Sequence, residues 1–151
     1  MKRNLLAILF LLLTTFAYSQ EIENIGGKYY KKGMLYSGTH TEFYDNHTPK
    51  TILNISNGLL EGSVTLFHQN GQKQEIRSYK NGNKDGLWIT WDEMGIKTAQ
   101  AEYRANVKNG DWFIWSSTGK PLYELHYNQG EKTGIWKIYD ETGKLISERK
   151  Y

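Results

Sequence analysis

The 151-residue sequence contains no cysteine, and this absence removes several classes of protein at once. Disulfide bonds, thiolate metal sites and thiol nucleophiles all need cysteine, and so does the lipid-modified N-terminus of a lipoprotein. With 38% hydrophobic and 23% charged residues, the chain has the composition of one modest folded domain. Its stability must therefore come from the fold alone.

The sequence also has little excess charge. It holds 19 basic and 16 acidic residues, and two of the basic ones, Lys2 and Arg3, fall in a segment that we expect to be removed. The remaining balance of 17 to 16 gives no electrostatic attraction for a phosphate backbone. We therefore expect no nucleic-acid partner.

The first 19 residues have the pattern of a secretory signal peptide. Lys2 and Arg3 precede an apolar run over residues 5–13, and Ala17 and Ser19 supply small side chains at a cleavage site. The run is shorter than the ~20 residues that span a bilayer, which disfavours an uncleaved anchor. The pattern predicts cleavage after Ser19 and an exported protein, in either the periplasm or the extracellular space.

An internal repeat is the strongest signal in the rest of the chain. Glycines recur at intervals of 24 residues, at Gly38, Gly62, Gly86, Gly110 and Gly134. With this glycine as repeat position 1, position 6 is always aromatic: Phe43, Phe67, Trp91, Trp115 and Tyr139. Position 18 holds Ile55, Tyr79, Tyr103, Tyr127 and Tyr151, and position 3 holds His40, Val64, Trp88, Trp112 and Trp136. All five tryptophans thus occupy positions 3 and 6.

Each repeat reads as strand, turn, strand, loop. Position 10 is glycine in four of five copies, as a tight turn with positive φ requires, and Asn57-Gly58, Asn81-Gly82 and Gln129-Gly130 punctuate the second loop. The pattern predicts an all-β fold, an elongated, meandering antiparallel single sheet of 24-residue hairpins. We expect a degenerate N-terminal hairpin over 20–37, turning at Lys32-Gly33, and then five repeats. The predicted repeats are 38–61, 62–85, 86–109, 110–133 and 134–151.

The aromatic residues predict a ladder between strands. With two strands per repeat, equivalent rings lie ~10 Å apart, so a side chain of the intervening strand must bridge them. Positions 3 and 6 have opposite parity, which leaves two alternatives. Either aromatic rows lie on both faces of the sheet, or a bulge brings them to one dry face.

The sequence resembles the MORN-variant repeat family. The resemblance covers residues 38–151 and is clearest in the segment from Gly86 through Trp88 and Trp91 to Tyr103. It implies a repeat scaffold that binds proteins or lipids, without catalytic residues. The stretch from Tyr29 to Gly38 also resembles the opening hairpin of the subgroup commonly labelled toxin/antitoxin system antitoxins.

No pattern predicts catalysis, a cofactor or a metal site. The histidines stand at four different repeat positions without metal-ligand spacing: His40, His47, His68 and His126. Carboxylates such as Asp92 and Asp140 fall in turns, where a single sheet offers no cleft for paired acid and base. We therefore expect a protein that is not an enzyme.

Two rows of side chains are candidate binding surfaces. The aromatic candidates are Trp88, Trp91, Trp112, Trp115 and Trp136, and the basic candidates at position 23 are Lys84, Lys108 and Lys132. A structural role for the rings and a solvated turn for the lysines are the competing interpretations. The main hypothesis is an exported scaffold that holds a protein partner. Recognition of a glycan by the tryptophans, peripheral membrane binding through the lysines and an antitoxin-like role are the alternatives.

Overall fold

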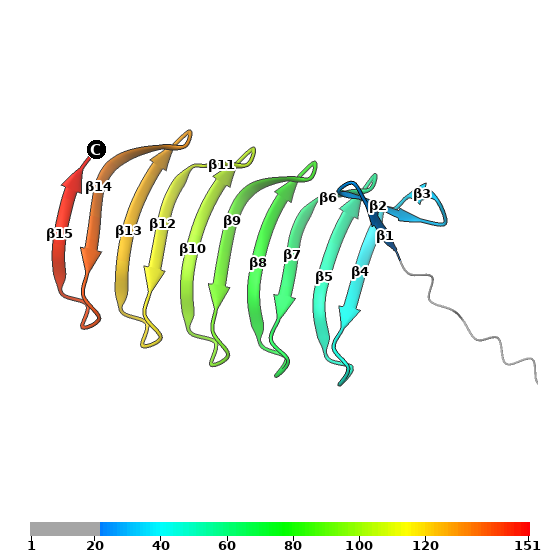
Figure 1. Cartoon of the computed structure of the whole chain (residues 1–151), viewed down its shortest axis with the longest axis horizontal. Helices are drawn as coiled ribbons and strands as arrows, with labels where there is room; N and C mark the ends of the chain where they lie inside the picture. Colours follow the sequence, from blue (N-terminus) through cyan, green and yellow to red (C-terminus); the bar gives the residue numbers. More distant parts are fainter. Residues whose placement is uncertain (1–21) are drawn as a thin grey trace, which may run out of the picture.

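The computed structural model describes residues 22–151, which form fifteen β-strands and no helix (Figure 1). The predicted signal peptide lies outside the described residues. The strands are β1 (Glu23–Ile25), β2 (Lys28–Lys31), β3 (Met34–Leu35), β4 (Gly38–Phe43), β5 (Pro49–Ser56), β6 (Leu59–Leu60), β7 (Gly62–Phe67), β8 (Lys73–Lys80), β9 (Asn83–Trp91), β10 (Lys97–Arg104), β11 (Val107–Lys108), β12 (Gly110–Trp115), β13 (Pro121–Asn128), β14 (Glu131–Tyr139) and β15 (Leu145–Lys150).

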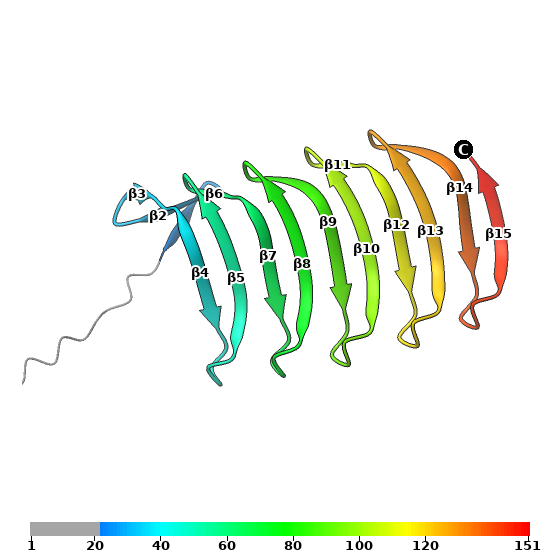
Figure 2. The same cartoon turned by 180° about the vertical axis from the view of Figure 1, so that it is seen from behind.

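The strands from β4 onward form one open antiparallel sheet of 12 strands. Its main path follows chain order from β4 to β15, with the short strands β6 and β11 paired to β5 and β10. No main-path strand crosses over another, and the sheet does not close on itself (Figures 1 and 2). The predicted all-β meander is therefore confirmed.

One rim of the sheet is a row of five-residue turns over repeat positions 7 to 11. In each turn the position-10 N–H donates to the carbonyl oxygen of position 7, as from Gly95 to Asp92 at 3.0 Å. Position 10 has positive φ in every copy, between 64° at His47 and 85° at Gly143. Glycine adopts this conformation without steric cost, which explains the repeated glycine, whereas His47 adopts it with a side chain.

The opposite rim is a row of two-residue turns at positions 20 and 21, with positive φ at both. Asn-Gly pairs suit such turns because their twist matches that of the strands. The turns are joined side by side, since the position-21 N–H donates to the position-23 carbonyl of the preceding repeat. A preceding side chain also accepts from the position-20 N–H, as Glu61 Oε2 does from Asn81 at 2.6 Å.

A β-bulge recurs in every repeat, and it lies on the strand that does not carry positions 3 and 6. The register shifts between positions 5 and 6, which leaves the position-13 residue of the second strand without a partner. The extra residue lies on the second strand, so the first strand keeps its regular alternation and positions 3 and 6 project to opposite faces. Of the two alternatives, the one that places aromatic residues on both faces is therefore correct.

The N-terminal strands β1 to β3 form a separate three-stranded sheet that we call the cap. It contains the expected turn at Lys32-Gly33, preceded by a second turn at Gly26-Gly27 that the sequence did not predict. The cap lies at the β4 end of the large sheet (Figure 2). The Gly58 N–H donates to the Tyr36 carbonyl at 2.8 Å, and a Cβ at Gly58 would lie 2.6 Å from Leu35 Cδ2.

The buried core of the described chain is small and lies under this cap. Leu53, Ile55 and Val64 are the buried hydrophobic residues, each at most 6% exposed. Ile22 and Tyr29 pack on this cluster. From β8 onward no described side chain is buried, because a single sheet without a second layer leaves both faces in contact with solvent.

The turn at Ala105-Asn106 differs from the other two-residue turns because it has alanine at position 20, and this difference generates a prediction. Ala105 has φ of 47°, and an alanine in this region costs about 1 kcal/mol that asparagine partly avoids. We expect Ala105→Asn to raise the free energy of unfolding by about 0.5 kcal/mol in urea titrations. The reverse change in a turn with the same capping bond, Asn81→Ala, should lower it by a similar amount. If both variants are as stable as the wild type, the positive φ of Ala105 is not a source of strain.

Candidate binding surface

A continuous aromatic ladder runs across the sheet from β8 to beyond β15. Tryptophan at position 3 alternates with tyrosine at position 18, and each ring contacts the ring on the next strand. Ring centroids are 4.8 to 5.7 Å apart, with planes inclined by 51° to 64°. The members are Tyr79, Trp88, Tyr103, Trp112, Tyr127, Trp136 and Tyr151. Tyrosine is the bridging side chain that the ~10 Å spacing required.

Each ladder tryptophan is anchored by the same hydrogen bond. The indole N–H donates to the carbonyl oxygen of position 17, ten residues earlier in the chain. The distances are 3.2 Å from Trp88 to Ser78, 3.0 Å from Trp112 to Glu102 and 3.0 Å from Trp136 to His126. The indole orientation is therefore fixed by the backbone of the neighbouring strand, which indicates a structural role for these rings.

The three candidate lysines lie on the ladder. Each ammonium sits 4.3 to 4.4 Å from the centroid of a tryptophan and 4.7 to 4.9 Å from that of the next tyrosine. Lys84 covers Trp88 and Tyr103, and the same arrangement repeats at Lys108 and Lys132. The candidate basic row and three of the candidate tryptophans thus form one surface, which we call the ladder face. The sequence did not predict these cation–π contacts.

The other two candidate tryptophans lie on the opposite face. Trp115 stacks on Phe113, two residues earlier, at 5.6 Å, and Phe113 follows Trp112 on the strand. Lys97 lies 4.9 Å from the Trp115 ring. Successive strand residues alternate between faces, so Trp115 and its equivalent Trp91 point away from the ladder. Position 6 forms no ring-to-ring row between repeats, which was not apparent from its regular aromatic content.

Arg77 and Glu75 form a pair of charged groups at the β8 end of the ladder. The Arg77 guanidinium lies 5.3 Å from the Trp88 ring and donates to Glu75 Oε2 at 2.6 Å, and this hydrogen bond raises the pKa of Arg77. Burial raises the pKa of Tyr79, although the positive charge of Arg77 acts against it. Burial also raises the pKa of Tyr103, and Glu75 adds to this effect. The phenols therefore stay neutral and the guanidinium charged at physiological pH.

Where the first repeat meets the second, aliphatic packing replaces the ladder. Leu60 occupies the lysine position, and Ile55 and Val64 occupy the tyrosine and tryptophan positions. These side chains are covered by the cap, which packs Tyr29 and Tyr36 against them. The apolar residues at ladder positions were the available signal for a second layer here. The ladder face is thus covered at its N-terminal end and open from β8 onward.

The histidines do not converge. His68 Nε2 lies 3.0 Å from the Trp91 carbonyl oxygen, and His126 Nδ1 lies 2.6 Å from Asp111 Oδ1. Within residues 22–151, no three His, Asp or Glu side chains are placed to hold a metal ion. No helix in that part of the chain is long and apolar enough to cross a membrane.

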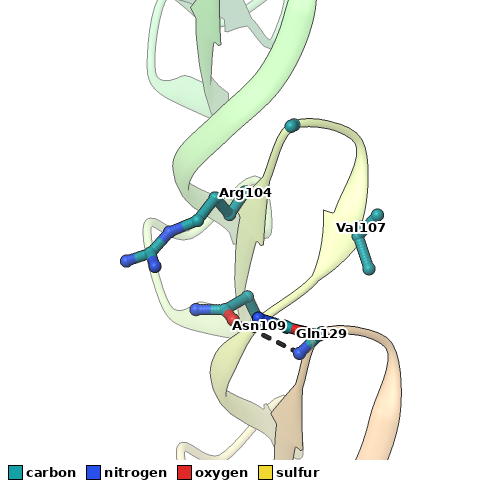
Figure 3. A pocket seen from close by; sticks show the side chains of 5 residues that line it. Arg104, Val107, Asn109 and Gln129 are labelled. Carbon is teal, nitrogen blue, oxygen red and sulfur yellow. Dashed lines mark hydrogen bonds between the residues drawn. The ribbon is translucent and has the colours of Figure 1, made fainter.

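A shallow hollow of about 300 Å³ lies between neighbouring two-residue turns (Figure 3). Its lining includes Arg104, Val107, Asn109 and Gln129, and Asn109 Oδ1 accepts a 3.4 Å hydrogen bond from the Gln129 N–H. The Arg104 side chain points away from Val107 in this view. The hollow contains a single charged group, so it brings together no acid and base for catalysis.

Comparison with protein families supports the repeat assignment. The family described as MORN repeat variant matches residues 60–81, 108–129 and 132–151, which is less than half of the chain. The three matches begin at the same repeat position, and they confirm the predicted resemblance for these segments. The match extends no support to the antitoxin subgroup. Repeats of this family generally mediate protein or membrane interactions and are generally non-enzymatic. No curated protein matches the sequence.

The anchored indole generates a test of the ladder. Trp112→Phe keeps a ring but removes the hydrogen bond to Glu102, so we expect the free energy of unfolding to fall by about 1–2 kcal/mol. Trp115→Phe, on the opposite face, should cost less than about 1 kcal/mol because its indole makes no such bond. Urea titrations of both variants measure the difference. If the two variants lose the same stability, the indole anchor is not what stabilises the ladder.

Proposed function

We propose that this chain is a non-enzymatic exported protein that holds a protein partner on its extended sheet. The observation that carries the proposal is the open sheet itself, whose ten main-path strands span about 43 Å with both faces accessible from β8 onward. Proteins bind through wide surfaces of this kind, whereas catalysis requires groups that converge. The match to a family of generally non-enzymatic interaction repeats supports the same function.

The arrangement of the tryptophans favours a protein partner over a glycan. A sugar stacks on a free aromatic face, but each ladder tryptophan has a tyrosine on either side and a lysine over its ring. A glycan would have to displace the lysine first. A protein partner can contact the lysine side chains and the exposed ring edges without displacing the lysines.

Export rests on the sequence pattern of residues 1–19, and it can be tested directly. We expect intact-mass measurement of the protein from the producing cell to find a chain that begins at Gln20. Leu9→Arg, which interrupts the apolar run, should leave the full-length precursor inside the cell. Recovery of wild-type protein that still begins at Met1 in the cytoplasm contradicts export.

The binding function predicts a stoichiometric partner. A tagged chain starting at Gln20 should recover one protein from envelope extract, and the purified partner should bind it at a fixed ratio by calorimetry. Deletion of residues 86–109 removes one whole period and preserves the repeat register, so this variant should remain folded and bind more weakly. Recovery of only anionic lipid would favour the membrane alternative, and recovery of nothing above the tag control contradicts the proposal.

A further inference from the structure

The ladder face carries three lysine ammoniums that have no carboxylate partner among the described residues. The ion pairs within residues 22–151 join Arg77 to Glu75, His126 to Asp111 and Lys137 to Glu124, and none includes a ladder lysine. Each ladder ammonium instead contacts two rings. An ammonium has three N–H donors, so those directed away from the rings remain available to an anion.

The ladder face carries more positive than negative charge. Arg77 and Arg149 lie over ladder rings near its two ends, at 5.3 and 5.0 Å, and they add to the three lysines. Between β8 and β15, strand alternation brings one carboxylate to this face, Glu75, and it is already bonded to Arg77. The chain after residue 19 is nearly neutral, so positive charge is concentrated on the ladder face.

The spacing of the lysines restricts what fits them. Successive lysines are separated by two strands, or about 10 Å along the sheet. A polyproline II helix has three residues per turn and rises about 9.3 Å per turn, so every third side chain lies on the same side. A β-strand would turn every third side chain to the opposite side. Aromatic surfaces are also the surfaces on which polyproline II segments dock.

We propose that the ladder face binds an extended acidic segment of a protein partner in the polyproline II conformation. One carboxylate every third residue lies opposite Lys84, Lys108 and Lys132, and the intervening residues pack on the ring edges between the lysines. This inference rests on the proposed protein-binding function and names the chemistry of the partner. The cation–π contacts hold the ammoniums in place, so less side-chain entropy is lost when the carboxylates bind.

Two synthetic peptides of identical composition test the spacing. The peptide EPPEPPEPP places a glutamate at every third residue, and EEEPPPPPP places all three together. Fluorescence anisotropy of labelled peptides with the chain from Gln20 to Tyr151 should show at least fivefold tighter binding of the spaced peptide, since one well-placed ion pair contributes about that factor.

Charge variants locate the binding to the ladder face. We expect Lys108→Gln to weaken binding of the spaced peptide about fivefold, and Lys108→Arg to restore most of it. Lys97→Gln is the matched control, because it removes a lysine from a ring on the opposite face and should leave binding unchanged. Circular dichroism confirms that each variant is folded before binding is measured.

Five results would each overturn the inference. If the spaced peptide does not bind, the ladder face does not take an acidic polyproline II segment. If the two peptides bind with equal affinity, the spacing of the glutamates does not matter. If Lys97→Gln weakens binding as much as Lys108→Gln, the peptide does not bind specifically to the ladder face. Binding to anionic vesicles or to dextran sulfate that the spaced peptide does not compete with also overturns it. If a variant with Lys84, Lys108 and Lys132 all changed to Gln still captures the partner fully, the protein-binding function stands and this inference fails.

Discussion

The sheet depends on the contact between a tryptophan of one strand and a tyrosine of the next. Equivalent residues of successive repeats are too far apart to touch, so a row of one aromatic type alone would leave a gap at every second strand. Alternation of Trp and Tyr places a ring on each strand, with centroids near 5 Å. Each ring then contacts both of its neighbours, and the ladder links strands that have no second layer behind them.

The other regular features serve the same single layer. Lysine ammoniums lie over the rings of neighbouring strands, as Lys108 does over Trp112 and Tyr127, and these contacts link one repeat to the next. At the turn rim, Asp85 accepts from the Ala105 N–H in the same way that Glu61 accepts from Asn81. Both devices connect each repeat to the next, so stability is distributed along the array. Among the described residues, a second layer lies only over the first repeat and the start of the second, and there aliphatic residues replace the ladder.

The two faces that result have different chemistry. The ladder face is positive and lined by anchored rings, whereas the opposite face combines Trp115 and Lys97 with the pair of Lys137 and Glu124. Titratable groups lie in rows along the sheet and do not converge at one point. A surface of this kind supports recognition of an extended partner. Because the two faces of the sheet differ in charge, such a partner can bind one face in preference to the other.

Much of this arrangement was determined by the sequence alone. The 24-residue period, the order of strands and turns and the need for a bridging ring follow from local φ preferences and strand spacing, which neighbouring residues dictate. The bulge at position 13 has no residue signature, because Lys50, Gln74 and Leu122 share no property. Only strand pairing showed that the bulge lies on the second strand, which leaves Trp115 on the face opposite to Trp112. Placement of Lys108 over two rings and of the cap over Val64 likewise required contacts between distant residues. Such contacts exist only once the strands are paired, and local sequence preferences do not specify them.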